Sequence, residues 1–250
     1  MQSSNPILKD NLFSREAALT TSTDVMTFKG VVNKTFALIA ICFLTSALTW
    51  GTLIGLPAEQ AGLATGVLIG SAILGAIVAF VTIFKHSWSP TTAPLYAAIQ
   101  GVVLGSVSLM FERQYPGIVF QAVLLTFGVL FSLLFAYRSG WIRATEKFKI
   151  GVFAATGAIA IVYIASMVLG MFGIQIPMIH TSSPVGIAFS VIVVIIASLN
   201  FILDFDRIEN GVAARAPKYM EWYSGFAILI TLVWLYMEIL RLLGKVRDRR

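Results

Sequence analysis

Seven apolar runs, separated by short polar segments, make up most of the chain. They cover residues 35–56, 61–84, 94–111, 118–137, 150–172, 185–204 and 222–243. Each run can cross the roughly 30 Å hydrocarbon core of a bilayer as an α-helix. The connections are short, so we expect consecutive helices to be antiparallel neighbours. The pattern predicts an all-α integral membrane protein folded as a seven-transmembrane-helix bundle.

Polarity divides the chain into three parts. Residues 1–30 are polar and carry both signs of charge, without the pattern of a cleaved signal peptide, so we expect a polar cytoplasmic N-terminal segment. Residues 31–243 form the seven-helix transmembrane domain, and residues 244–250 form a basic tail. Glu238 interrupts the last apolar run. That segment therefore either spans the membrane or is re-entrant.

The composition agrees with a membrane protein. Hydrophobic residues make up 58% of the chain and charged residues 12%, whereas soluble domains have roughly 45–50% and about 25%. A net charge of +6 would suggest nucleic-acid binding in a soluble protein, but here the basic residues cluster between apolar runs. We therefore expect no nucleic-acid partner. The single cysteine, Cys42, excludes an intrachain disulfide and a Cys-x-x-Cys metal site.

The basic residues also predict the orientation of the chain. Twelve Lys and Arg residues fall in the N-terminal segment and in the loops on its side, whereas the loops on the other side contain only Arg113. The positive-inside rule then places the N-terminus in the cytoplasm. We expect a multi-pass protein of the cell inner membrane. If the last run spans, the basic residues between positions 241 and 250 lie on the outer side, against this rule.

Small residues recur at four-residue spacing in the second and third apolar runs. Such stripes let transmembrane helices approach closely, so we expect these faces to be packing surfaces. The residues concerned are Gly66, Gly70, Ser71, Gly75, Ala97, Gly101 and Gly105.

Asp204 is the leading candidate for a functional residue because it lies inside the sixth apolar run. At 3.6 residues per turn, Asn200, Asp204 and Arg207 share one face of a helix, while Asp206 points the opposite way. An ionisable group at membrane depth is unfavourable unless it faces a partner, the bundle interior or water, so it indicates a functional site. The alternative is a helix-end carboxylate paired with Arg207.

Two further acids lie in the last run or at its start. Glu221 follows Asp204 after a loop of about fifteen residues, so the two carboxylates can be near neighbours. Glu238 lies one turn before Arg241, which predicts either a local ion pair or a role in a pore. The candidate ion- or proton-sensing residues are thus Asp204, Asp206, Glu221 and Glu238, with Arg207 and Arg241 as charge partners.

Several kinds of enzyme site are absent from the sequence. The histidines, His86 and His180, both fall in expected loops, so neither a zinc cluster nor a His-Glu-x-x-His helix is present. There is no Gly-x-Ser-x-Gly nucleophile pattern, no phosphate-binding loop, and no lysine in the last apolar run for a retinal Schiff base. An aspartyl protease using Asp204 with Glu221 or Glu238 is an alternative that no surrounding motif supports. We expect no enzymatic activity and no cofactor, with Ca²⁺ as at most a transient ligand.

Four stretches together resemble one family. They are APLYAAIQG at 93–101, YPGIVFQA at 115–122, ILDFDRIENG at 202–211, and EWY at 221–223 with WLYMEILRLL at 234–243. The chain resembles the Bax inhibitor-1/YccA-like (TMBIM) family, specifically a bacterial branch, over about residues 30–243. The resemblance implies a seven-helix bundle with a central last helix and a pH-sensitive calcium leak. In some members it also implies regulation of cell death or of a membrane protease.

The resemblance carries over to this chain only in part. The helix-six aspartate of the family matches Asp204. Many members have an aspartate within the last helix, but here residues 226–234 read FAILITLVW and offer only Thr231. The two-aspartate proton sensor therefore does not carry over, and Asp206, Glu221 and Glu238 are the candidate substitutes. The basic gate at the end of helix two is reduced to Lys85 and His86.

These observations predict a slow, proton-modulated cation leak, with Asp204 sensing protons or lining the path. We expect the side chain of Asp204 to change protonation state within the physiological pH range, because burial favours its neutral form while Arg207 favours its charged form. The expected partners are the lipid bilayer, cations and protons. The alternative is a non-conducting regulator that binds a membrane protease through its helices or its N-terminal segment.

Overall fold

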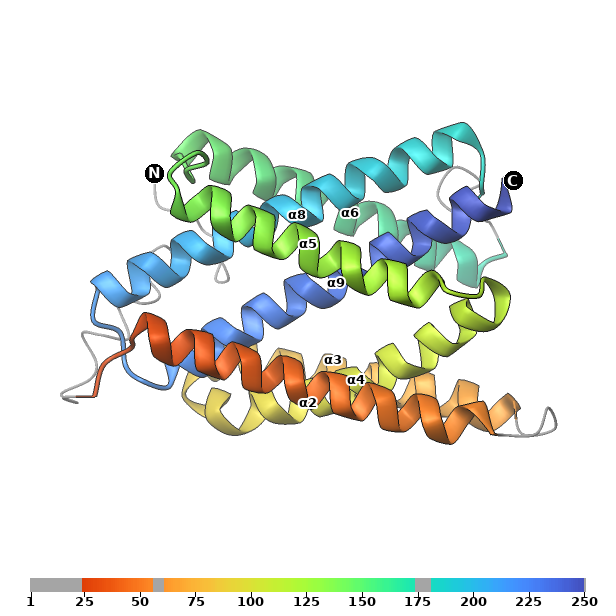
Figure 1. Ribbon diagram of the computed structural model, residues 1–250, viewed down its shortest axis with the longest axis horizontal. Helices are drawn as coiled ribbons and strands as arrows, with labels where there is room; N and C mark the ends of the chain where they lie inside the picture. The colour runs from red at the N-terminus through yellow and green to blue at the C-terminus, as the bar shows by residue number, and fades with distance from the viewer. Residues whose placement is uncertain (1–23, 56–60, 174–180, 250) are drawn as a thin grey trace. The chain divides into compact units, whose positions relative to one another are not determined.

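The computed structural model describes residues 24–55, 61–173 and 181–249, and they are almost entirely helical (Figure 1). A short 3₁₀ turn, His86–Trp88, precedes α4. Each of the seven long helices is long and apolar enough to cross a membrane. This confirms the predicted all-α fold with seven spans. The helices are α2 (Phe28–Ile54), α3 (Ala61–Phe84), α4 (Ser89–Gln114), α5 (Ile118–Arg138), α6 (Glu146–Met171), α8 (Pro184–Ala213) and α9 (Met220–Asp248).

Most of these helices extend beyond the apolar runs that predict them. The helix α9 continues through Asp248, so residues 244–248, expected to form a tail, are its last turns. Its 29 residues form one continuous helix. At about 1.5 Å per residue, it is longer than the roughly 30 Å hydrocarbon core. The apolar run marks the part of a helix that lies in hydrocarbon, whereas backbone hydrogen bonding carries the helix on into the polar region.

The chain forms two compact units, which we describe separately. The first comprises Met1–Met110 and Asp206–Ile230, and the second comprises Phe111–Phe205 and Thr231–Arg250. The boundaries fall within α4, α8 and α9, so each of these helices contributes to both units.

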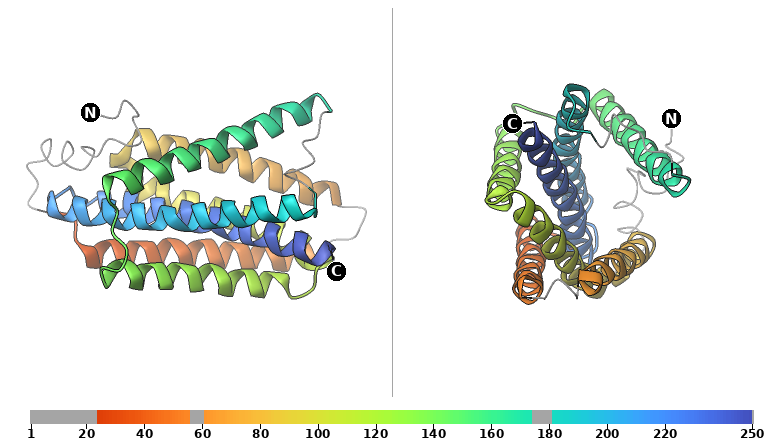
Figure 2. Two further views of the ribbon diagram at one scale, coloured as in Figure 1. Left: turned by 90° about the horizontal axis from the view of Figure 1, so that it is seen from above. Right: turned by 90° about the vertical axis from the view of Figure 1, so that its right-hand side faces the viewer.

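In the first unit, α4 packs between α2 and α3 (Figure 2). A Cβ atom at Gly101 would overlap the side chain of Thr45 and the carbonyl oxygen of Cys42, and one at Gly105 would lie 2.5 Å from the carbonyl oxygen of Ser46. The α4 backbone therefore approaches α2 too closely for larger side chains. This confirms the packing face predicted on the third apolar run.

The corresponding prediction is wrong for most of α3. A Cβ atom at Gly66 or Gly70 would meet nothing within 4 Å, and only one at Gly75 would reach α4, 3.4 Å from Ile99. Regular spacing of small residues shows that a face is able to approach a neighbour. Whether a neighbour is there depends on tertiary packing.

In the second unit, α6 presents one face to α8 and α9. Val152 and Ile159 on this face are buried. Thr156 and Tyr163 make polar contacts, with Asn200 of α8 and Glu238 of α9 respectively. These four residues alternate at intervals of four and three, the spacing of a single helix face. Apolar packing and hydroxyl contacts thus hold α6 against α8 and α9.

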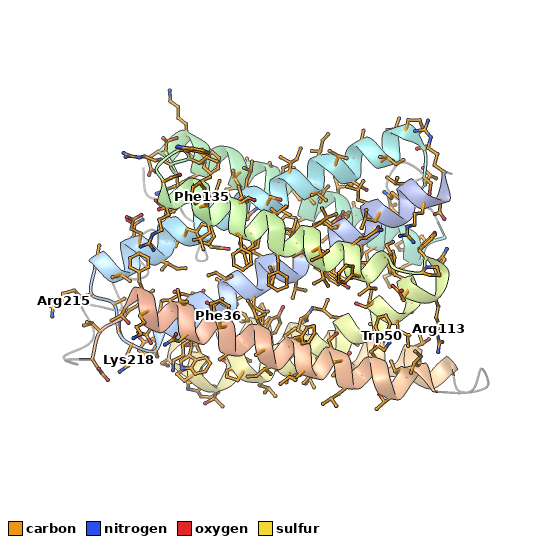
Figure 3. The ribbon with its side chains drawn as sticks, in the orientation of Figure 1. Phe36, Trp50, Arg113, Phe135, Arg215 and Lys218 are labelled. Atoms are coloured by element: carbon orange, nitrogen blue, oxygen red, sulfur yellow. The ribbon has the colours of Figure 1, made fainter. Side chains whose placement is uncertain are left out.

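The helices differ in how much of their surface is buried. In its most apolar stretch, α9 has 61% of residues buried, against 17% in α2, α3 and α6. The other helices carry large exposed apolar side chains, such as Phe36 on α2 and Phe135 on α5, both labelled in Figure 3. Such an apolar surface suits lipid rather than water. Of the seven long helices in the described residues, α9 is the most buried in its apolar stretch.

Candidate functional site

Asp204 lies in a buried part of α8. Asp204 is 5% exposed, and the adjacent Leu203 and Phe205 are also buried. On α9, the hydroxyl of Thr231 donates a hydrogen bond to Asp204 Oδ2 over 2.6 Å. This distance is typical of a hydroxyl bound to a charged carboxylate. The second unit therefore contains a buried carboxylate–hydroxyl pair that joins two helices.

Thr231 stands in this chain where the resemblance implies an acidic residue. It occupies the segment of the last helix where the resemblance implies an aspartate, and it is the hydrogen-bond donor to Asp204. A hydroxyl can donate to an ionised carboxylate and accept from a protonated one. The pair can therefore persist through a protonation change, although it contains one titratable group instead of two.

Asp206 has a different environment from Asp204, as the helical spacing predicts. It is half-buried and accepts a hydrogen bond from Asn210 Nδ2, one turn later, over 3.0 Å. Arg207, the proposed charge partner of Asp204, is also half-buried. Two carboxylates separated by one residue thus have clearly different exposure.

Glu238 lies in a three-residue cluster within the second unit. The residue is 2% exposed, and its carboxylate forms an ion pair with Arg241 Nη1 at 2.8 Å. From α6, the hydroxyl of Tyr163 donates to both carboxylate oxygens, at 3.0 and 3.1 Å, and accepts from Arg241 Nη1 at 2.9 Å. One of the two alternatives that the sequence offered for Glu238, a local ion pair with Arg241, is present. Tyr163 was not predicted as part of this cluster, because α6 and α9 are remote in the chain.

Glu221 acts as a cap for another helix. It is 2% exposed and accepts hydrogen bonds from the backbone N–H and the hydroxyl of Thr27, each at 3.0 Å. Thr27 is the N-cap of α2, and Glu221 itself is in the first turn of α9. A carboxylate is stabilised at a helix N-terminus, where the backbone N–H groups carry partial positive charge. Because a Cβ atom at Gly30 would overlap the Glu221 carboxylate, a larger residue does not fit there.

The segment before α2 pairs with the connection between α8 and α9. Met26 N–H donates to the Ala216 carbonyl at 2.7 Å, and Lys218 binds Asp24 at 3.0 Å. Figure 3 labels Lys218 in this connection. Its hydrogen bond to Asp24 raises the pKa of Lys218 above the ordinary lysine value. This contribution to stability is therefore fully present below the ordinary lysine pKa and is lost only as the pH rises through the raised pKa.

Lys245 is a polar residue whose position the sequence did not reveal. It was expected in the basic tail, but it lies in the last turns of α9 and is 5% exposed. Its ammonium donates to the Gly186 carbonyl at 3.1 Å and to the Ser190 hydroxyl at 2.8 Å, both near the start of α8. One available signal was its spacing, because it follows Thr231 and Glu238 at intervals of seven residues.

The residues proposed as a reduced basic gate make aromatic contacts. The Lys85 ammonium lies 4.7 Å from the ring centroid of Trp88. The rings of His86 and Tyr223 meet edge to face at 4.8 Å. His180 lies outside the described residues. Within the part of the chain that the structure describes, no three His, Cys, Asp or Glu residues are grouped so that they could hold a metal ion.

Comparison with known proteins identifies one family. Residues 5–248 match the family model described as Bax inhibitor 1 like. Neither the curated proteins nor the solved structures gave a match.

Proposed function

Since the chain belongs to the Bax inhibitor 1-like family, we propose that this polytopic membrane protein is a slow, proton-modulated cation leak. The observation that carries the proposal is the buried Asp204–Thr231 pair between α8 and α9. A carboxylate at membrane depth is unfavourable unless it has a function or a partner there. Here it has a hydroxyl partner whose hydrogen bond can reverse when the carboxylate binds a proton.

The proposed control acts through the charge of Asp204. When ionised, Asp204 supplies a negative charge that attracts cations, and it accepts the strong hydrogen bond from Thr231. A proton from acidic solution removes this charge. The protonated carboxyl can then donate to the Thr231 oxygen, which gives a weaker contact between α8 and α9. Cation flux is therefore expected to differ between acidic and neutral pH.

Glu238 is a weaker candidate for the controlling group. Its carboxylate shares one cluster with the Arg241 guanidinium and the Tyr163 hydroxyl. The ion pair has no net charge, and removal of Arg241 would leave the buried Glu238 carboxylate without its partner. We assign the cluster to holding α6 against α9.

We place the protein in the cell inner membrane with its N-terminus in the cytoplasm. The distribution of basic residues supports this orientation. The continuous α9, which is long enough to span, then carries the chain to the outer side. In this orientation the connection between α8 and α9 is cytoplasmic.

Ion flux in proteoliposomes tests the proposal. Purified protein is reconstituted into vesicles that contain a calcium-sensitive dye, and Ca²⁺ entry is followed between about pH 5 and pH 8. Protein-free vesicles give the background, and an ionophore gives the full signal. Flux above background that changes with pH supports the leak. Flux equal to that of protein-free vesicles at every pH overturns it, and a co-purifying membrane protease would then favour the alternative of a non-conducting regulator.

A further inference from the structure

One face of α9 carries a row of buried polar side chains through the second unit. Thr231, Glu238 and Lys245 follow one another at intervals of seven residues, two helical turns, and are 7%, 2% and 5% exposed. Residues at this spacing lie along the same face of a helix. Each contacts a neighbouring helix: Thr231 binds Asp204 of α8, Glu238 binds Tyr163 of α6, and Lys245 binds the start of α8.

The charges along this row change sign toward the end of α9. Asp204, beside Thr231, supplies a carboxylate. The next level contains Glu238 together with Arg241. The last level contains the ammonium of Lys245, held by the Gly186 carbonyl and the Ser190 hydroxyl.

Packing alone does not explain a lysine at position 245. A buried ammonium is unfavourable relative to an apolar side chain of similar volume, and buried ions at helix contacts are often replaced without loss of stability. Methionine has a similar length and would fill the same space. A charged group close to a membrane-spanning path, in contrast, can determine which ions pass.

We infer that Lys245 determines the charge selectivity of the ion path, by forming a positive barrier at the end of α9 remote from its Met220 start. This inference rests on the proposed function. The Coulomb energy between a fixed charge and an ion is proportional to the charge of the ion. Lys245 therefore opposes Ca²⁺ more strongly than K⁺ and keeps the calcium leak slow.

The test measures Ca²⁺ and K⁺ flux in the same proteoliposomes for the full-length protein and for Lys245→Met. Because the contribution of Lys245 to the barrier is twice as large for Ca²⁺ as for K⁺ and rate depends exponentially on barrier height, we expect about a two-fold rise in K⁺ flux and about a four-fold rise in Ca²⁺ flux. The fold-change for Ca²⁺ is thus close to the square of that for K⁺. Loosened packing would instead raise both fluxes by the same factor.

Two further variants separate charge from packing. Lys245→Arg keeps the charge and should retain the wild-type flux ratio. Ser190→Asp places a carboxylate beside the intact ammonium, since the Ser190 hydroxyl and the Lys245 ammonium are 2.8 Å apart. It should show the raised Ca²⁺ to K⁺ flux ratio expected for Lys245→Met, so it provides a test if Lys245→Met does not fold. A Ca²⁺ to K⁺ ratio in a folded Lys245→Met or Ser190→Asp protein that equals the wild-type ratio overturns the inference.

Failure of the proposed function gives a different result. If the wild type conducts neither ion, the leak proposal falls. Ca²⁺ flux that then arises in Lys245→Met still supports a barrier at this residue. If neither protein conducts, both the leak and the barrier are overturned.

Discussion

Thr231 of α9 donates a hydrogen bond to Asp204 of α8 over 2.6 Å, and both residues are buried. In many members of the family, the resemblance implies a second aspartate in the last helix. Here a hydroxyl is the partner instead. The site therefore pairs one carboxylate with a hydroxyl, where the resemblance implies two carboxylates.

Thr231→Val tests the contribution of this hydrogen bond. Valine has nearly the same shape but leaves the Asp204 carboxylate without its hydroxyl donor, and hydrogen bonds to charged groups contribute about 1.5–3 kcal/mol. We expect a loss of stability of this size in detergent, measured by chemical unfolding. Thr231→Ser keeps the hydroxyl and should be close to the wild type. Equal stability of the Val and wild-type proteins would show that the contact contributes nothing.

Asp204→Asn should fix cation flux at its acidic value at every pH. Asparagine resembles the protonated acid in shape and charge but cannot titrate. Asp206→Asn is the matched control, because Asp206 is half-buried and hydrogen-bonded to Asn210; it should alter the profile much less. Calcium flux in proteoliposomes between about pH 5 and pH 8 measures both. An Asp204→Asn protein that keeps the wild-type pH profile removes this residue from the mechanism.

Arg241→Leu should destabilise the protein by about 3–5 kcal/mol, because it leaves the buried Glu238 carboxylate without its guanidinium partner. The double variant Glu238→Leu/Arg241→Leu removes both charges and should recover most of this loss. Unfolding measurements on the single and double variants form a thermodynamic cycle. Additive effects of the two substitutions would contradict a coupled pair.

Gly101→Leu should lower the yield of folded protein, since even a Cβ atom at this position would overlap Thr45 and Cys42 of α2. Gly66→Leu is the control, because a Cβ atom there meets nothing within 4 Å. Yield and thermal stability in detergent report on both variants. Comparable losses in the two would mean that both glycines pack against a neighbour.

A reporter fused after Arg250 should give a signal on the outer side of the membrane. The helix α9 has 29 continuous residues and is long enough to span, so it should carry the chain away from the cytoplasmic N-terminus. The basic residues at its end oppose this orientation under the positive-inside rule. With a cytoplasmic N-terminus, a cytoplasmic signal would mean that the chain crosses the membrane an even number of times and that the last helix does not span.

The pattern of apolar runs was enough to predict the fold class and the helices. Long apolar runs specify membrane helices because an isolated segment must satisfy its own backbone hydrogen bonds in lipid. The same local information made the Glu238–Arg241 pair one of two alternatives for Glu238, since residues three positions apart are neighbours on one helix. It also predicted the different environments of Asp204 and Asp206, because helical periodicity places them on different faces.

The residues that meet across helices could not be predicted from this pattern and are known from the folded structure. Thr231 is 27 positions from Asp204, and Tyr163 is 75 from Glu238. Such pairs depend on the rotation and depth of each helix relative to its neighbours, and the spacing within one helix does not determine either quantity. The same reason explains the burial of Lys245, the capping contact of Glu221 and the open space beside Gly66. Periodicity limits the faces on which a residue can lie, but packing selects its partner.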